Sequence, residues 1–163
     1  MNEAIRIMIT GGTFDKDYDP LSQTLTFRHT HLPEILSSVR ITIPVEVEIN
    51  QLTDSLDMDD SQRNRVVDAC AASPESRIIV THGTDTMTVT AEWIAERELD
   101  KVICVTGAMV PYSVAGSDAV FNLGAAFTAV QVMPRGVYVV MNGRVFPAGT
   151  VVKNRETGEF QSP

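Results

Sequence analysis

Side chains that could do chemistry are concentrated in residues 81–87. They are Thr81, His82, Gly83, Thr84, Asp85, Thr86 and Met87. The segment follows the apolar run 77–80, which we predict to be a buried strand, and precedes a run with helical spacing over 87–97. A strand that turns into a helix here holds hydroxyls and a carboxylate beside the free N–H groups of a helix N-terminus, which stabilise developing negative charge. Thr and Asp are also common N-cap residues, so this segment alone favours an ordinary cap.

A second reactive hydroxyl follows the first predicted strand. Residues 5–10 are predicted to form a strand that ends at Gly11, Gly12 and Thr13. The two glycines let the backbone turn tightly and a ligand approach closely, and Thr13 then presents its hydroxyl. A phosphate site is disfavoured, because the chain contains neither G-x-G-x-x-G nor G-x-x-x-x-G-K-[ST] and the residues after the turn are acidic.

A threonine nucleophile needs a base nearby. His82 lies at the junction of strand and turn, a position more typical of a hydrogen-bonded core histidine than of a base. Lys153 and Asp85 are the other candidates, since burial can lower the pKa of a lysine and an aspartate can orient it. Most lysines are solvated surface charges, so the sequence supports this role for Lys153 only weakly. We find no cluster with metal-ligand spacing and predict neither a metal nor a cofactor.

Strands and helices alternate along the chain. We expect strands at 5–10, 41–49, 77–80, 101–106 and 137–141, and helices at 31–39, 59–72, 87–97 and 117–131. Residues 14–30 are expected to be a long polar loop of the kind that acts as a lid, residues 143–153 a small hairpin, and residues 154–163 a polar tail. This order predicts one α/β domain over 1–163. It would be a three-layer, mainly parallel sheet, Rossmann-like or flavodoxin-like, with helices on both faces and a small C-terminal hairpin.

Every polar cluster follows a predicted strand. In such sheets ligands bind beyond the carboxyl ends of the strands, where the strand order reverses. The clusters at 11–13, 54–55, 84–85 and 107–109 should therefore form one shared site.

Composition limits the possible partners. The formal net charge of −8 argues against nucleic acid or an anionic membrane, both of which need a basic surface. No apolar run approaches the ~20 residues of a membrane span, and the first residues lack a signal-peptide pattern. Cys70 and Cys104 are isolated and are expected to be small buried hydrophobes. We expect a cytoplasmic protein.

Several segments together resemble the bacterial-type L-asparaginases. Residues 10–13 and 81–87 are similar to the two signature segments of that family. The turn at 54–58 resembles the substrate-binding turn of its cytoplasmic members. Residues 107–111, 117–118 and 121–123 resemble the next family block, and residues 139–143 and 151–153 the stretch that carries the family's lysine. The resemblance covers nearly the whole chain.

The resemblance implies an amidohydrolase that converts L-asparagine to L-aspartate and ammonia, with L-glutamine as a weaker substrate. Thr13 would be the nucleophile that forms an acyl-enzyme, and Thr84, Lys153 and Asp85 would form a second, triad-like group. Tyr18 would be the lid tyrosine beside Thr13. The implied substrate-binding residues are Gly12, Asp54, Ser55, Thr84, Asp85 and Ala108.

The chain also departs from the family pattern. Members are usually about twice this length and have a second domain that supplies acidic and amide groups to a neighbouring subunit's site. We therefore expect an N-terminal-type domain without the C-terminal one, weaker substrate affinity, and a homodimer or homotetramer. Two alternatives stay open: a module that binds asparagine or aspartate without turnover, and a purely structural subunit.

Overall fold

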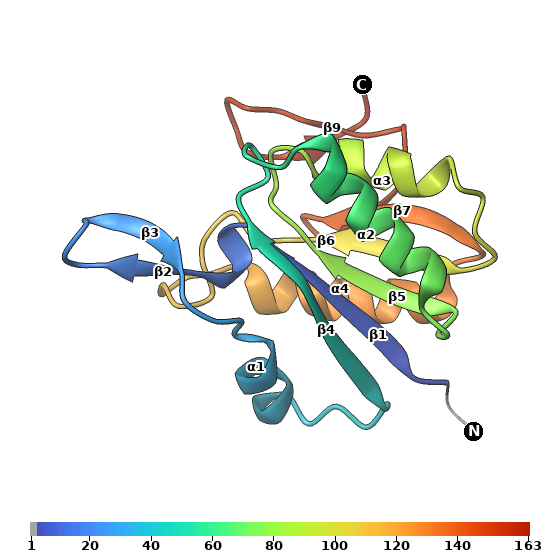
Figure 1. Ribbon diagram of the computed structural model, residues 1–163, viewed down its shortest axis with the longest axis horizontal. Helices are drawn as coiled ribbons and strands as arrows, with labels where there is room; N and C mark the ends of the chain where they lie inside the picture. The colour runs from blue at the N-terminus through green and yellow to red at the C-terminus, as the bar shows by residue number, and fades with distance from the viewer. Residues whose placement is uncertain (1–2) are drawn as a thin grey trace.

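The computed structural model describes residues 3–163 and contains a six-stranded central sheet (Figure 1). The strand order is β4-β1-β5-β6-β7-β8. The strands are β1 (Ile5–Gly11), β4 (Val45–Thr53), β5 (Arg77–Thr81), β6 (Val102–Thr106), β7 (Gly136–Met141) and β8 (Arg144–Pro147). The helices are α1 (Leu32–Ser38), α2 (Asp60–Ala72), α3 (Met87–Ala95) and α4 (Ala119–Val132). The predicted α/β class is confirmed.

Strand order fixes where a ligand can bind. The first five strands of the sheet run parallel, and only β8 pairs antiparallel, with β7. In the chain β1 is followed by β4 on one side and then by β5 on its other side. This is the flavodoxin-like order with an extra antiparallel edge strand, and its order reverses between β1 and β5. The predicted shared site therefore belongs at the carboxyl ends of these two strands.

The sheet is buried on both faces. Alternate residues of β1 face opposite sides, with Ile7 packed in the core beneath α1 and α4, and Met8 in the core beneath α2 and α3. In Figure 1, α2 and α3 lie in front of the sheet and α4 behind it. Cys70 and Cys104 are free and buried in these cores, as expected, and burial raises the pKa of each thiol to about 12. Both thiols are therefore packing groups.

The start of α2 explains the acidic residues near 59. Asp59 is the N-cap: its carboxylate accepts from the backbone N–H of Gln62 at 2.8 Å, and the Gln62 side chain accepts from the Asp59 N–H at 3.0 Å. This reciprocal capping box satisfies donors that a helix start leaves free. The helix expected over 59–72 is confirmed, with Asp59 as its N-cap.

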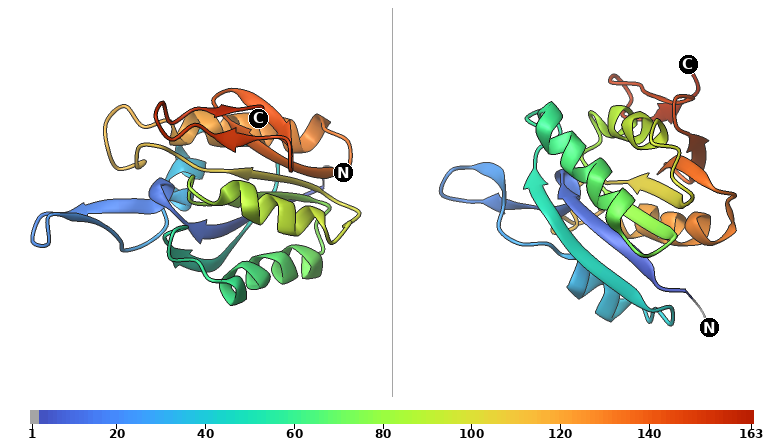
Figure 2. Two further views of the ribbon diagram at one scale, coloured as in Figure 1. Left: turned by 90° about the horizontal axis from the view of Figure 1, so that it is seen from above. Right: turned by 45° about the vertical axis from the view of Figure 1, so that its right-hand side comes forward.

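The segment 14–30 is not the irregular loop that we expected. A short 3-10 turn, η1 (Thr13–Asp15), leads into a hairpin of β2 (Lys16–Asp19) and β3 (Thr24–Phe27). The hairpin extends away from the sheet in both views of Figure 2. The structure shows a short polar hairpin, which we missed because its apolar residues are few and mostly exposed.

Two further boundaries differ from expectation. The strand predicted at 41–49 begins only at Val45, because Pro44 precedes it and cannot donate to a ladder, and it continues to Thr53 beside β1. Residues 143–153 do not form one hairpin: β8 pairs with β7, while β9 (Val152–Lys153) pairs with β10 (Phe160–Gln161) in the segment expected to be a polar tail. Phe160 is buried and anchors that segment to the core. No helix described within 3–163 has the length and apolarity needed to cross a membrane.

Candidate active site

Three loops meet at the carboxyl edge of the sheet, and two glycines hold them together. A Cβ built on Gly12 would lie 2.4 Å from the Cα of Gly83, and one built on Gly83 would lie 2.5 Å from Oγ of Ser55. Gly12 also has φ of +79°, which other residues rarely adopt. The loops after β1, β4 and β5 are therefore in contact. Each of the predicted residues Thr13, Ser55 and Thr84 lies on one of these loops.

The predicted triad is assembled in the structure. Lys153 Nζ donates to Thr84 Oγ1 at 2.8 Å and to Asp85 Oδ1 at 3.0 Å. The Lys153 side chain is 12% exposed and that of Asp85 is 32% exposed. Lys153 lies on β9, so pairing of β9 with β10 holds the lysine against the loop after β5. The arrangement links a hydroxyl, an amine and a carboxylate in one hydrogen-bonded group, which can move a proton to or from Thr84 or a bound water.

The ordinary-cap interpretation of residues 84–86 does not hold. Thr86 is the N-cap of α3, yet its side chain makes no capping bond and donates instead to the backbone oxygen of Ser55 at 2.9 Å. Thr84 and Asp85 lie before the cap and bond to Lys153. Thr86 therefore ties the loop after β5 to the loop after β4, and Thr84 and Asp85 tie it to β9. Helix capping accounts for none of these side-chain bonds.

Two side chains hold the loop after β6: Asp118, the N-cap residue of α4, and Asn122, in the first turn of that helix. Asp118 accepts from the backbone N–H groups of Met109 and Val110, each at 3.0 Å, and Asn122 donates to the Gly107 oxygen at 2.9 Å. Ala108 lies between these anchors and is buried against the core. The predicted binding residue Ala108 therefore stands on a rigid turn at the same edge of the sheet.

Lys16 is a charged neighbour of the site that we did not select from the sequence. Its Nζ forms an ion pair with Asp54 Oδ2, and the Leu56 N–H donates to Asp54 Oδ1 at 3.0 Å. The hydrogen bond from Lys16 lowers the pKa of the Asp54 carboxyl. This pair joins the first residue of the β2–β3 hairpin to the loop after β4. In the sequence, the one feature that could have pointed to Lys16 is its position three residues after Thr13.

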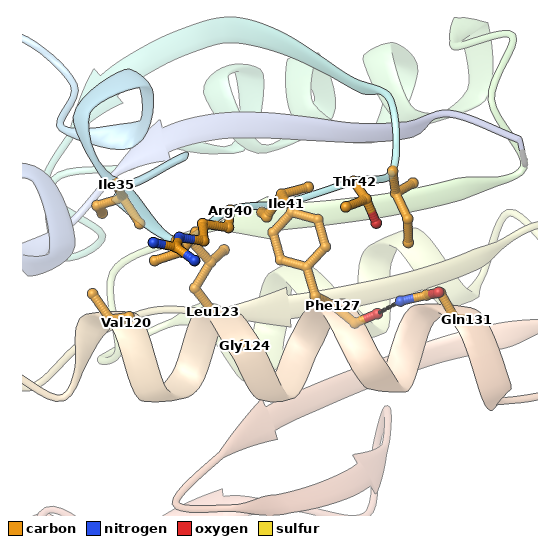
Figure 3. A pocket seen from close by; sticks show the side chains of 11 residues that line it. Ile35, Arg40, Ile41, Thr42, Val120, Leu123, Gly124, Phe127 and Gln131 are labelled. Atoms are coloured by element: carbon orange, nitrogen blue, oxygen red, sulfur yellow. Dashed lines mark hydrogen bonds between the residues drawn. The ribbon is translucent and has the colours of Figure 1, made fainter. Parts of the chain in front are cut away.

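An apolar hollow lies apart from these groups. It is a groove of about 350 Å³ between α4 and the segment that joins α1 to β4 (Figure 3). Its lining is mostly aliphatic, with Arg40 the one ionisable side chain. With no nucleophile beside a base, it offers no chemistry for hydrolysis.

The family model "Asparaginase, N-terminal" matches residues 4–163. The chain belongs to the asparaginase family. L-asparaginase 1 of Escherichia coli strain K12 is 27% identical over 173 aligned residues, which cover 99% of this chain and 51% of the relative. The structure of L-asparaginase I from Vibrio cholerae superposes with a TM-score of 0.85 at 25% identity, covering 100% of this chain and 52% of that one. The structure of a probable cytoplasmic L-asparaginase from Campylobacter jejuni superposes with a TM-score of 0.85 at 28% sequence identity. The match covers 99% of this chain and 53% of that one. The chain thus spans about half the length of these relatives.

Tyr18 was selected for the lid of this asparaginase-family domain. Within residues 3–163 its side chain makes no hydrogen bond to the group of Thr84, Lys153 and Asp85. It lies on β2 in the projecting hairpin and is 56% exposed. The hairpin base is better anchored: buried Asp15 accepts from the His31 N–H at 2.8 Å and from the Thr30 hydroxyl. Burial raises the pKa of the Asp15 carboxyl. Tyr18 therefore stays a prediction, on a strand whose base is fixed beside Thr13.

His82 of the second family segment is a buried core histidine, as expected from the sequence. Its Nδ1 lies 2.9 Å from the Gly83 oxygen and its Nε2 lies 2.8 Å from Thr90 Oγ1, which also accepts from Arg63. If the neutral ring donates from Nδ1 to the Gly83 oxygen, its Nε2 can accept the Thr90 hydroxyl proton, and Thr90 Oγ1 remains free to accept from Arg63. Burial lowers the pKa of His82 from 6.5 to about 4.

This depressed pKa predicts a loss of stability in mild acid. Below pH 6.5 the unfolded chain protonates His82, whereas the folded protein excludes that proton until about pH 4. The free energy of unfolding should therefore fall by about 2 kcal/mol from this group between pH 7 and pH 5. Urea unfolding at the two pH values measures the change. His82→Gln should lose this part of the pH dependence, while His29→Gln, at an exposed position, should keep it. An unchanged pH dependence in His82→Gln would contradict the assignment.

Proposed function

We propose that this chain is an L-asparagine amidohydrolase that converts L-asparagine and water to L-aspartate and ammonia. The observation that carries the proposal is the hydrogen-bonded group of Thr84, Lys153 and Asp85 beside the loop of Thr13, in a member of the asparaginase family. The related proteins of E. coli and V. cholerae are named L-asparaginases, and the chain is matched from end to end by both.

Two half-reactions account for the chemistry. The Thr13 hydroxyl oxygen attacks the side-chain amide carbon of the substrate, the C–N bond breaks, and the nitrogen leaves as ammonia with the proton that Thr13 gives up. A water molecule then attacks the resulting ester, and cleavage of the C–O bond returns the hydroxyl to Thr13. Lys153, oriented by Asp85, takes and returns protons through Thr84 or through that water. Backbone N–H groups around Thr84 would stabilise the oxyanion.

Substrate recognition follows from the charges at the edge of the sheet. The Asp85 carboxylate is one-third exposed and would bind the substrate ammonium. Ser55 would bind the carboxylate end, and the nearby ion pair of Lys16 with Asp54 would set the local charge balance. Gly12 and Ala108 would shape the pocket through their backbone. L-Glutamine, one methylene longer, would be a weaker substrate.

Ammonia release from the purified chain tests the proposal. Asparagine should give one ammonia and one aspartate per turnover, and glutamine should react more slowly. The matched blank is Thr13→Ala prepared in the same way, which removes contaminating host enzyme from the comparison. Calorimetric binding of asparagine without ammonia release above that blank would assign the chain to the class of binding modules instead.

We also propose a homo-oligomer, because a site at an open sheet edge needs a neighbour to exclude water. Light scattering at the assay concentration should give a dimer or tetramer. A fully active monomer would contradict this. The cytoplasmic location stays a prediction.

A further inference from the structure

Three potential metal ligands meet at the base of the β2–β3 hairpin. Asp17 comes from β2, and His29 and His31 come from the segment between β3 and α1. One ligand atom from each residue can be chosen so that all three lie within 4.8 Å of one another. From the sequence we predicted no metal site, because Asp17 and His29 are 12 positions apart and only the fold brings them together.

The geometry of the cluster is set by the alternation of neighbouring side chains. His31 Nε2 lies 3.0 Å from Asp17 Oδ1, and the rings of His29 and His31 have centroids 4.8 Å apart. Thr30 between them points its hydroxyl to Asp15. The two imidazoles therefore lie on the same side of the chain, facing Asp17.

Asp17 and His31 each have one buried polar atom without a hydrogen-bond partner. Five buried side-chain atoms in residues 3–163 have no hydrogen-bond partner, and two of the five are Asp17 Oδ2 and His31 Nδ1. His31 is only 6% exposed. The Glu34 carboxylate lies 3.8 Å from His31 Nδ1, which is too far for a hydrogen bond. An ion bound through Nε2, the nitrogen that lies next to Asp17, could also use the free Asp17 Oδ2 and would leave Nδ1 as the N–H donor on the side of Glu34.

Two imidazoles and one carboxylate are the ligand set of a three-coordinate protein site for zinc, with water in the fourth position. The oxygen-rich sites of Mg²⁺ and Ca²⁺ have a different composition. Two ligands of a tetrahedral zinc ion lie about 3.3 Å apart, close to the Asp17–His31 separation of 3.0 Å. The three ligand atoms lie within 4.8 Å of one another, and the exposed His29 side chain would have to move closer to the other two. We propose that Asp17, His29 and His31 bind one divalent transition-metal ion of the zinc type.

The bound ion would hold β2 on the side opposite to the ion pair of Lys16 with Asp54. Side chains alternate along β2, so Asp17 faces the histidines while Lys16 and Tyr18 face the other way, where Lys16 pairs with Asp54. The metal would thus tie β2 to the segment that leads into α1. This proposal is independent of the proposed hydrolysis, because metal binding can be measured without substrate.

Isothermal titration calorimetry with ZnCl₂ tests the site. The protein should carry no histidine tag, be freed of metal with EDTA, and be titrated at pH 7.5. Wild type should bind one Zn²⁺ per chain, and MgCl₂ under the same conditions should give no such binding. His29→Ala and Asp17→Asn should each weaken Zn²⁺ binding at least ~10-fold, because each removes a ligand. Asp19→Asn, on the same strand but bonded to Ser22 and Leu21, should bind like wild type.

Two further measurements show whether a loss of Zn²⁺ binding in a variant comes from the lost ligand or from misfolding. Circular dichroism must show that the variants are folded, and His29→Ala, at an exposed position, is the variant least expected to disturb the fold. Excess Zn²⁺ should raise the melting temperature of wild type by a few degrees and leave that of His29→Ala nearly unchanged. Absence of Zn²⁺ binding to wild type, or equal affinity in wild type and His29→Ala, would overturn the proposal.

Discussion

Thr13→Ala is expected to abolish asparagine hydrolysis and leave the fold intact. The residue follows the Gly11-Gly12 turn at the carboxyl end of β1, on a loop that contacts the loop of Thr84. If its hydroxyl forms the acyl-enzyme, no other group can replace it, and the rate should fall by at least about 10³-fold. The ammonia-release rate under saturating asparagine measures the effect.

Two matched variants separate a chemical role of Thr13 from a structural one. Thr13→Ser keeps a hydroxyl and should retain measurable activity, whereas Thr42→Ala removes an exposed threonine in the α1–β4 connection and should leave the rate unchanged. Urea unfolding should give similar midpoints for all three variants, since Thr13 is only partly buried. Activity of Thr13→Ala within about tenfold of wild type would remove Thr13 as the nucleophile.

The sequence predicts the sheet well because its parallel strands are short apolar runs. Residues 78–80 are buried on both faces, and such a run followed by polar residues and a helical pattern has few alternatives to a buried parallel strand. The polar clusters at 11–13, 54–55, 84–85 and 107–109 then fall at one edge of the sheet in the structure. The β2–β3 hairpin was not predictable in the same way, because its strands are short and pack against little.

Parts of the site depend on contacts between distant residues that leave no local pattern. Lys153 lies 68 positions from Asp85, and nothing in its surroundings distinguishes it from a surface lysine. Its residue type made it a weak candidate for the base, and the resemblance to the asparaginase family strengthened that assignment. The same reason explains why the sequence did not reveal the ion pair of Lys16 with Asp54 or the cluster around His31. Each joins residues from different elements. Such contacts can be found only from the three-dimensional structure, whereas the ends of strands can be predicted from the pattern of apolar residues in the sequence.

Lys153→Met is expected to lower the rate of asparagine hydrolysis by roughly 10²-fold or more, the range for loss of an acid–base group. Its Nζ donates to both Thr84 and Asp85, so the substitution removes both bonds at once. The control is Lys101→Met, which removes another partly buried lysine whose Nζ donates to the backbone oxygen of Glu75 at 3.0 Å. That change should reduce stability and leave the rate per folded molecule unaltered.

The double variant Lys153→Met, Asp85→Asn decides whether the two residues act together in the chemistry. If Asp85 works by orienting Lys153, then Asp85→Asn should slow wild type strongly but cost much less once Lys153 is already gone, so the two effects should be far from additive. Asp85 would also bind the substrate ammonium, and this part of its effect should persist in the double variant as a raised KM. Comparing kcat with KM across the four proteins separates the two roles. Additive effects on kcat would show that Lys153 and Asp85 act independently, and the triad-like group would have to be abandoned despite the 3.0 Å bond between them.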